Sequence, residues 1–403
     1  MRILQLTKKY PFPAKDGESI AILNLAKALN SRGHEVHLLA MNTLKHYIPN
    51  TDNTRPILLE CYSEVKTEVV DNRVKLVPAF LNLFSTESYH ISRFKSPAFS
   101  RLLENYLLDF DFDIVQLETP YLAPYIPLIR RCSTAKVCMR AHNVEFEIWE
   151  RLSSQSTFGP KKWYVAYLTN KLRRYELKQL SLYDGLLPIT KRDALHFQDL
   201  GYNGPLEVIP VGLEMDNYPE DYSSFDQSPS VGFIGSLDWA PNLEGLHWFI
   251  KNIWPKLKKE HPELKFHIAG RNPSEETLAL GKDPQIIIHG EVDSAVQFML
   301  QHSLHVVPLL SGGGMRVKVL EAMALGRVVL STSVGVEGIF ATPEKEILLA
   351  DSSEIFLQKL ADCIQQKYPI LEIAKAARNR IEQDFVLDEI GGRLSKFYQE
   401  ELR

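Results

Sequence analysis

The alternation of short apolar strands with amphipathic helices is the feature that most constrains how this 403-residue chain can fold. The chain opens with the apolar strand ILQLT, passes through a turn-rich loop, and enters a run with apolar residues at helical spacing before the strand EVHLLAM. Further strands are predicted at 113–118, 136–142 and 185–190. Such alternation predicts a mostly parallel sheet with helices on both faces.

A polar stretch at about 210–230 ends this first run, because it is rich in Pro, Asp, Ser and Tyr and lacks apolar periodicity. The alternation then restarts, with strands predicted at 231–237, 264–270, 285–290, 304–310 and 328–332. We therefore predict an α/β protein with two Rossmann-like domains, residues 1–212 and 213–383. An amphipathic, charged stretch from about residue 370 predicts a final helix, and residues 384–403 are assigned to this C-terminal helix.

The charge balance and the cysteine spacing argue against several classes of protein. A formal net charge of -4, with both signs scattered along the chain, disfavours dedicated nucleic-acid binding. The first residues lack the apolar run of a secretory signal, and no segment approaches the roughly 20 apolar residues of a membrane span, so we expect a cytoplasmic protein. The four cysteines have no C-x-x-C spacing and are expected to be buried, reduced thiols.

The segment SGGGMRVKVLEAMALGRVVLST, residues 311–332, carries the most chemical information. A predicted buried strand runs into three glycines and then into a helix that begins near Arg316 and Lys318. Glycines let the backbone approach a ligand closely, and the first amides of a helix attract an anion. From these residues alone, a phosphate site and a plain strand-to-helix turn with surface cations are equally good interpretations.

The same segment resembles the nucleotide-sugar site of the retaining glycosyltransferases of family 4, in the branch with a GGG-x-R-x-K signature. The phrases LEAMALG and VVLST carry the likeness, together with FIGSLDWAPN, FHIAGRNP and IIIHGEV in the same order. In the first half of the chain, YPFPAKDGESI and MRAHNVEFEIWERL add to it. The resemblance implies the GT-B fold, in which a cleft separates two Rossmann-like domains and a C-terminal helix crosses back to the acceptor-side, N-terminal domain.

The resemblance also implies which residues bind and activate a nucleoside-diphosphate sugar. His142 is expected to face the reacting sugar, and Arg316 and Lys318 the diphosphate, so these three are the predicted catalytic residues. Glu321, one helical turn beyond Lys318, can accept hydrogen bonds from a ribose. The predicted donor-binding residues are Gly17, Gly235, Ser236, Arg271, Gly312, Gly313, Gly314, Met315, Val317 and Glu321.

The chain departs from the family pattern in two places, at Gly313 and around the loop after the first strand of the second domain. Gly313 stands where many relatives have a glutamate that contacts the donor sugar, and Ser236 with Pro241 or Asn242 stands where relatives often have an arginine and a lysine. The positive charge at the diphosphate is therefore expected from the cations that follow the three glycines.

Three of the predicted residues have a plainer interpretation when the resemblance is set aside. His142 ends an apolar strand and is typical of a structural histidine, although it lies at the edge where open α/β sheets bind ligands. Gly17 is typical of a surface turn, and Arg271 of a solvated loop.

Two further segments are candidates for contacts with partners. Lys161 to Arg174 mixes cations with Trp163, Tyr164 and Tyr167, which fits either an anionic lipid surface or a helix with one solvated basic face. The aromatic segment 80–110 is a candidate flap on the acceptor side.

We conclude from the sequence that the chain is a glycosyltransferase acting between a nucleoside-diphosphate sugar and a glycan or lipid-linked acceptor, with retention, in polysaccharide or other glycoconjugate synthesis. No metal or other cofactor is expected, because no cluster with ligand spacing is present. A peripheral contact with the inner face of the membrane is compatible with this assignment. The alternatives are a nucleotide-sugar epimerase of the same fold and a non-catalytic sugar-nucleotide-binding partner, which Gly313 keeps open.

Overall fold

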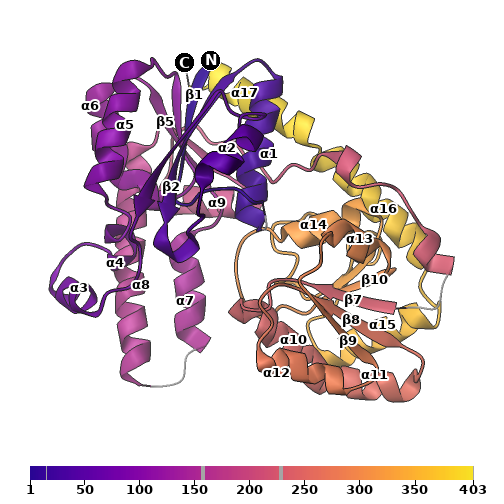
Figure 1. Ribbon diagram of the computed structural model, residues 1–403. Coiled ribbons are helices and arrows are strands. Elements are labelled where there is room, and N and C mark those ends of the chain that lie inside the picture. Colours follow the sequence, from indigo (N-terminus) through magenta and orange to yellow (C-terminus); the bar gives the residue numbers. More distant parts are fainter. Residues whose placement is uncertain (15, 156–158, 227–229, 403) are drawn as a thin grey trace. The chain divides into compact units, whose positions relative to one another are not determined.

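The computed structural model describes residues 1–14, 16–155, 159–226 and 230–402. The chain divides into two compact units: unit 1 comprises Met1–Gly212 with Leu387–Arg403, and unit 2 comprises Leu213–Val386. Each unit holds one six-stranded sheet, and the paired strands are parallel (Figure 1). This confirms the predicted α/β fold with two Rossmann-like domains. Of the polar stretch at about 210–230, residues 227–229 lie outside the described part of the chain.

The strands of unit 1 lie in the order β3-β2-β1-β4-β5-β6, so the direction of strand succession reverses between β1 and β4. The strands are β1 (Arg2–Thr7), β2 (Glu35–Thr43), β3 (Glu64–Val70), β4 (Ile114–Leu117), β5 (Lys136–Ala141) and β6 (Gly185–Pro188). The α-helices are α1 (Gly17–Ser31), α2 (Thr51–Leu58), α3 (Leu76–Leu81), α4 (Tyr89–Ser92), α5 (Pro97–Asp109), α6 (Ile126–Cys132), α7 (Glu145–Gln155), α8 (Pro160–Gln179), α9 (Lys191–Asp199) and α17 (Leu387–Glu400).

Successive residues of the central strand β1 face two different layers of helices. Ile3 lies in an apolar cluster with Leu25 of α1 and Leu394 of α17. Leu4 lies in another cluster, with Phe99 of α5. The two-residue period of a strand thus gives each face of the sheet its own helical cover.

The C-terminal helix α17 belongs to unit 1, where it packs against α1. Gly391 permits a close approach, since a Cβ added there lies 2.6 Å from the Cβ of Ala28. The expectation of a single helix from residue 370 is wrong, because the chain forms α16 (Ile370–Asp384) and then α17. Between the two helices, Phe385 is the C-cap of α16, and its carbonyl accepts a hydrogen bond from the Leu213 amide at 2.8 Å. Unit 2 ends at Val386.

Unit 2 repeats the parallel arrangement with the strand order β12-β11-β10-β7-β8-β9. Its strands are β7 (Ser230–Ile234), β8 (Lys265–Ala269), β9 (Ile286–Gly290), β10 (Leu304–Val307), β11 (Val328–Ser331) and β12 (Leu348–Leu349). Its α-helices are α10 (Ala240–Asn252), α11 (Trp254–Glu260), α12 (Glu275–Ala279), α13 (Ala295–Leu300), α14 (Val317–Ala324), α15 (Ser353–Ile364) and α16.

Two parts of unit 1 differ from the sequence-based expectation. β3 is not predicted, because it is an edge strand whose sequence EVKTEVV is mostly polar and buries only Val65 and Val70. The segment 80–110 is not one flap, since α5 within it buries Phe99 and Leu103 against the sheet.

Candidate functional site

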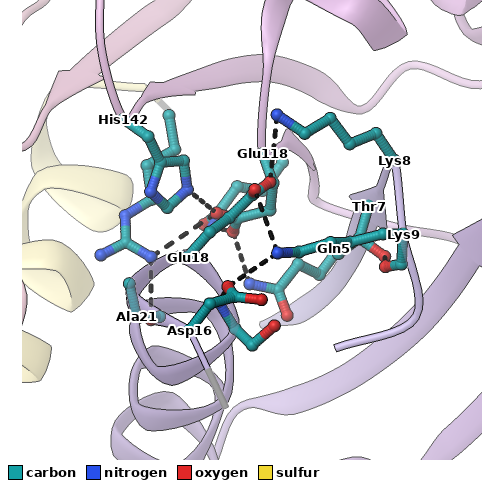
Figure 2. Close-up of polar contacts among 12 residues, drawn as sticks. Gln5, Thr7, Lys8, Lys9, Asp16, Glu18, Ala21, Glu118 and His142 are labelled. Atoms are coloured by element: carbon teal, nitrogen blue, oxygen red, sulfur yellow. Dashed lines mark hydrogen bonds and ion pairs between the residues drawn. The ribbon is translucent and has the colours of Figure 1, made fainter. Parts of the chain in front are cut away.

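In unit 1, polar side chains gather where three neighbouring strands end. β1, β4 and β5 are adjacent and parallel, so the residues that end or follow them, Thr7, Glu118 and His142, lie along one edge of the sheet. Open α/β sheets bind ligands at this edge, near the point where the strand order reverses. Figure 2 shows the side chains of Glu118 and His142 meeting there.

Glu118 is fully buried and is the shared acceptor of this group. Its Oε2 lies 2.8 Å from His142 Nε2 and 3.5 Å from Arg140 Nη1, and its Oε1 accepts a hydrogen bond from Gln5 Nε2 at 2.5 Å and another from the Gln116 amide. Burial by itself raises the pKa of Glu118, but Arg140 and the hydrogen bond from His142 outweigh burial and hold this pKa below its ordinary value. Glu118 is therefore an ionised carboxylate.

This carboxylate determines which nitrogen of His142 is available to a ligand. Since an ionised carboxylate only accepts hydrogen bonds, Nε2 of His142 carries the proton in their contact, and Nδ1 is the nitrogen that a ligand can use. The His142 side chain is 11% exposed, whereas that of Glu118 is 0% exposed. His142 can thus touch a ligand while Glu118 positions it. Arg140 is structural, because it is buried and donates to the Ala21 carbonyl at 2.9 Å.

The loop between β1 and α1 adds a group of paired charges beside Gly17, the first residue of α1 (Figure 2). Lys9 Nζ lies 2.7 Å from Asp16 Oδ1 and 3.3 Å from Glu18 Oε2, and Lys8 Nζ lies 3.4 Å from Glu18 Oε1. Burial by itself raises the pKa of Glu18, but the two lysines outweigh it and lower this pKa to about 2. The loop therefore combines ammonium donors with carboxylate acceptors, which suits the hydroxyl groups of a sugar.

In unit 2, the loops that follow β7 and β8 meet at two glycines. A Cβ added at Gly270 lies only 1.8 Å from the Gly235 carbonyl oxygen, so a side chain at position 270 is incompatible with this contact. Beside the glycines, Arg271 Nε donates to Ser236 Oγ at 3.2 Å, and this hydroxyl donates to Asp238 Oδ1 at 2.5 Å. The structure thus brings together the predicted donor-binding residues Gly235, Ser236 and Arg271.

The glycine-rich loop between β10 and α14 depends on left-handed backbone conformations. Gly312 has φ 111° and Gly314 has φ 76°, which residues with a side chain rarely adopt. Arg316 is the N-cap residue of α14, as expected for a group at a helix N-terminus. Its Nη1 donates to the Gly313 carbonyl, and its guanidinium lies 5.2 Å from the centroid of the Trp239 ring. In this structure Arg316 therefore contacts both its own loop and the loop between β7 and α10.

The first turns of α14 hold the other predicted residues. Lys318 Nζ lies 2.7 Å from Glu321 Oε2, and the Tyr218 hydroxyl donates to Glu321 Oε1 at 3.2 Å. These two contacts hold a carboxylate that is almost completely buried. The side chains of Met315 and Val317 are also buried, which leaves their backbone amides as the groups that can meet a ligand.

The described residues also bear on metals, membranes and thiols. Among them, no group of three or more His, Cys, Asp or Glu side chains is arranged to hold a metal ion. No described helix is long and apolar enough to cross a bilayer. None of the four cysteines, all of which lie in the described residues, forms a disulfide. Cys138 and Cys363 are buried and Cys61 and Cys132 are half-buried, so the prediction of buried thiols is wrong for the second pair.

Glu118, Lys8, Lys9 and Glu18 are not among the residues predicted from the sequence. A signal for Glu118 was present, because an acidic residue that directly follows a buried strand lies at the same sheet edge as His142. The loop residues carry no comparable signal, since their pairing depends on how the loop folds over α1.

Solved structures with related folds cover nearly the whole chain. The sucrose-phosphate synthase of Thermosynechococcus elongatus has a TM-score of 0.72 and 14% identity, with 99% of both chains covered. Anabaena HepE, solved in complex with UDP-glucose, has a TM-score of 0.68 and 14% identity, again with 99% of both chains covered. These likenesses show the GT-B fold.

The sequence matches two family descriptions: Glycosyltransferase Family 4 over residues 16–217, and Glycosyl transferases group 1 over residues 228–366. A curated relative, an uncharacterized 44.6 kDa protein in the cps region of Klebsiella pneumoniae, is 26% identical over 398 residues, covering 95% of this chain and 96% of the relative. The chain belongs to glycosyltransferase family 4. The prediction of a glycosyltransferase is thereby confirmed.

Proposed function

We propose that this glycosyltransferase moves a sugar from a UDP-sugar to a glycan or lipid-linked acceptor, with retention of the anomeric configuration, in the synthesis of a surface polysaccharide. The observation that carries the proposal is the glycine-rich loop that ends at Arg316, the N-cap of α14, in a family 4 chain. HepE, which shares the fold, was solved with UDP-glucose, and the Klebsiella relative is encoded in a cps region. These two likenesses support the choice of nucleotide and of product class.

Departure of the nucleoside diphosphate is the demanding step, because negative charge grows on the leaving phosphate oxygen while positive charge grows on the sugar ring. We assign stabilisation of the diphosphate to Arg316, Lys318 and the first amides of α14. The acceptor hydroxyl attacks the face from which the diphosphate leaves, and its proton passes to the departing phosphate oxygen. This route needs neither a metal ion nor a covalent enzyme intermediate.

Arg316 has to exchange one acceptor for another in this mechanism. In the present structure it donates to the neutral Gly313 carbonyl. A diphosphate is a charged acceptor and forms stronger hydrogen bonds with a guanidinium than a carbonyl does. The donor is therefore expected to draw Arg316 away from its own loop.

His142 is assigned to the transferred sugar, with Nδ1 contacting one of its hydroxyl groups. The Glu118 carboxylate keeps Nε2 occupied and fixes the ring plane, so the contact is organised before the donor binds. This assignment makes Glu118 a positioning residue and His142 a catalytic one.

A screen of UDP-, GDP-, ADP- and dTDP-sugars by thermal unfolding tests the donor. At about 100 times its dissociation constant, the correct donor stabilises the folded protein by about 2.7 kcal/mol. Transfer is then followed by NMR with membrane extracts as the acceptor source, with and without EDTA. The proposal predicts a product with the donor's anomeric configuration and a rate insensitive to EDTA.

Other results of these assays would assign a different function. An inverted product contradicts retention. Conversion of the donor to an epimer without acceptor identifies an epimerase. Tight donor binding with neither transfer nor hydrolysis identifies a non-catalytic binding protein.

A further inference from the structure

A short segment of unit 1 exposes a cluster of apolar side chains that the site described above does not use. It comprises α3, the residue Val74 before it and the 3-10 turn η2 (Asn82–Phe84). Between 61% and 85% of the surface of each of these side chains is exposed: Val74, Leu76, Val77, Phe80, Leu81 and Phe84. Figure 1 shows α3 standing clear of the sheet. We call these six side chains the α3 patch, and contiguous apolar patches of this kind mark interaction sites on soluble proteins.

A seventh exposed apolar side chain, Trp163 of α8, is linked to the same segment. Its ring stacks on the Tyr167 ring with the centroids 5.6 Å apart, and the Tyr167 hydroxyl donates to the Leu83 carbonyl at 2.6 Å. Trp163 is 66% exposed. The patch therefore gains an aromatic residue from a helix that is distant in sequence.

The inner side of the segment is firmly held, so the exposure of the patch is not a result of poor packing. Ala79 is buried in a cluster with Tyr89 and Leu168. The Tyr89 hydroxyl bonds both the amide and the carbonyl of Lys75, at 3.0 and 3.1 Å. Lys171 donates to the Asn82 carbonyl. Hydrogen bonds thus hold the inner side of the segment, while its apolar side chains face solvent. This arrangement is the opposite of the usual one, in which apolar groups are buried away from water.

The charges around the patch select an anionic partner. Residues 71–95 and the helix α8 together contain ten lysines and arginines against three acidic residues, in a chain whose net charge is -4. Within residues 71–95, Arg73 and Lys75 pair with Asp71 and Lys95 pairs with Glu87, and Lys171 of α8 is buried, so the excess positive charge comes chiefly from the other cations of α8. The side chain of Lys161 lies outside the described part of the chain and enters only this count. A partner with negative charges above an apolar layer complements both features.

We propose that the α3 patch docks the protein on a lipid bilayer that contains anionic lipids. The apolar side chains enter the boundary between headgroups and acyl chains, Trp163 lies at headgroup level, and the cations of α8 that are not buried contact lipid phosphates. The rings of Phe80 and Phe84 contact each other, with their centroids 5.8 Å apart, on a short element that protrudes from the sheet, a shape that a fluid lipid layer accommodates without a matching surface. The docking joins the basic aromatic helix and the start of the segment 80–110 into one surface. Docking on a bilayer would bring the enzyme to a lipid-linked acceptor. This choice of acceptor rests on the proposed function.

Vesicle sedimentation tests the docking with the full-length protein. Phosphatidylcholine vesicles containing phosphatidylglycerol are expected to bind it at least about tenfold more tightly than vesicles of phosphatidylcholine alone. The double variant Phe80→Ser, Phe84→Ser is expected to lose about tenfold or more in vesicle affinity, because two exposed rings no longer enter the bilayer. Phe340→Ser is the matched control, since Phe340 lies in unit 2 and is 54% exposed. This control variant keeps the affinity of the original protein.

Two outcomes of the vesicle assay overturn the docking: no binding of the protein to either kind of vesicle, or an equal loss of vesicle affinity in the double variant and in Phe340→Ser. A third outcome also overturns it: if the protein self-associates without lipid and the double variant does not, the α3 patch binds a second copy of the chain. Unchanged melting temperature and unchanged UDP affinity show that the double variant is folded. The α3 patch and α14 lie in different units, so the two proposals can be tested separately. If the double variant loses vesicle binding but still binds UDP, the loss is due to the α3 patch. If the original protein does not bind UDP, the proposed function is contradicted.

Discussion

Replacing Glu118 by glutamine tests whether the buried carboxylate positions His142 for catalysis. The substitution keeps the shape of the side chain but removes its charge and one of its two acceptor oxygens. The carboxylate now accepts from Gln5, Gln116 and His142 and pairs with Arg140. An amide cannot satisfy all four donors, and its NH₂ group must face either the two glutamine amides or the imidazole and the guanidinium.

Two magnitudes follow from this geometry. Arg140 is fully buried, so loss of its carboxylate partner leaves a buried charge without compensation, a destabilisation of about 3–5 kcal/mol. If the new NH₂ group faces His142, Nε2 must become an acceptor and the imidazole shifts to the other tautomer. Loss of a carboxylate that orients a metal-bound histidine lowers activity about 10- to 100-fold, and we expect a similar factor for this histidine. We expect kcat to fall by this factor while the KM for the donor stays nearly constant.

The assay compares donor turnover and thermal unfolding in the same preparations. Tyr398→Phe is the matched control, because the Tyr398 hydroxyl donates to Gln116 in the same buried network but does not touch His142. Both variants lose stability, and only Glu118→Gln loses turnover. A folded Glu118→Gln protein with kcat within twofold of the original refutes the positioning role.

Three further variants or conditions have expected outcomes. His142→Ala lowers kcat about a hundredfold with little change in donor affinity or melting temperature, and an active but destabilised protein would show that the residue is structural. Desolvation lowers the pKa of buried His305 to about 4, below the value near 6.5 of an unfolded histidine, so this residue's contribution to stability is complete above about pH 6.5 and declines toward pH 4. Urea unfolding at both pH values should show a loss of up to about 3 kcal/mol from His305, and His305→Gln should lack that part of the pH dependence. Gly270→Ala destabilises by at least about 2 kcal/mol because its Cβ overlaps the Gly235 carbonyl, whereas Gly281→Ala, whose Cβ meets its nearest atom at 3.5 Å, leaves the urea midpoint unchanged.

Most of the fold could be predicted from the sequence because buried parallel strands are short apolar runs, as in β1 and β10. The same strand pattern predicts His142 at the sheet edge, where the structure has it, and its role as a catalytic residue stays a prediction. The pattern of short apolar runs does not predict β3, because this edge strand is mostly polar and buries only Val65 and Val70.

Two features could not be predicted from the pattern of apolar residues: contacts between strands that are distant in sequence, and the exposure of apolar side chains. Gln5 and Glu118 are 113 residues apart, and only the strand order brings them to the same place. The contact of Arg316 with the Gly313 carbonyl depends on two left-handed glycines, whose angles the letters do not specify. The apolar run of α3 predicts burial by its composition, whereas the structure exposes it.

Calorimetry of UDP binding to Arg316→Ala tests the central claim, that the loop at the N-terminus of α14 binds the diphosphate. A charged hydrogen bond contributes about 1.5–3 kcal/mol, so the variant should bind UDP about 10- to 100-fold more weakly. Lys318→Ala should lose less, because an ammonium lacks the two-pronged geometry of a guanidinium. Lys282→Ala, which removes an exposed cation of unit 2 far along the chain from this loop, should bind UDP as the original protein does. Unchanged UDP affinity in Arg316→Ala would contradict the account.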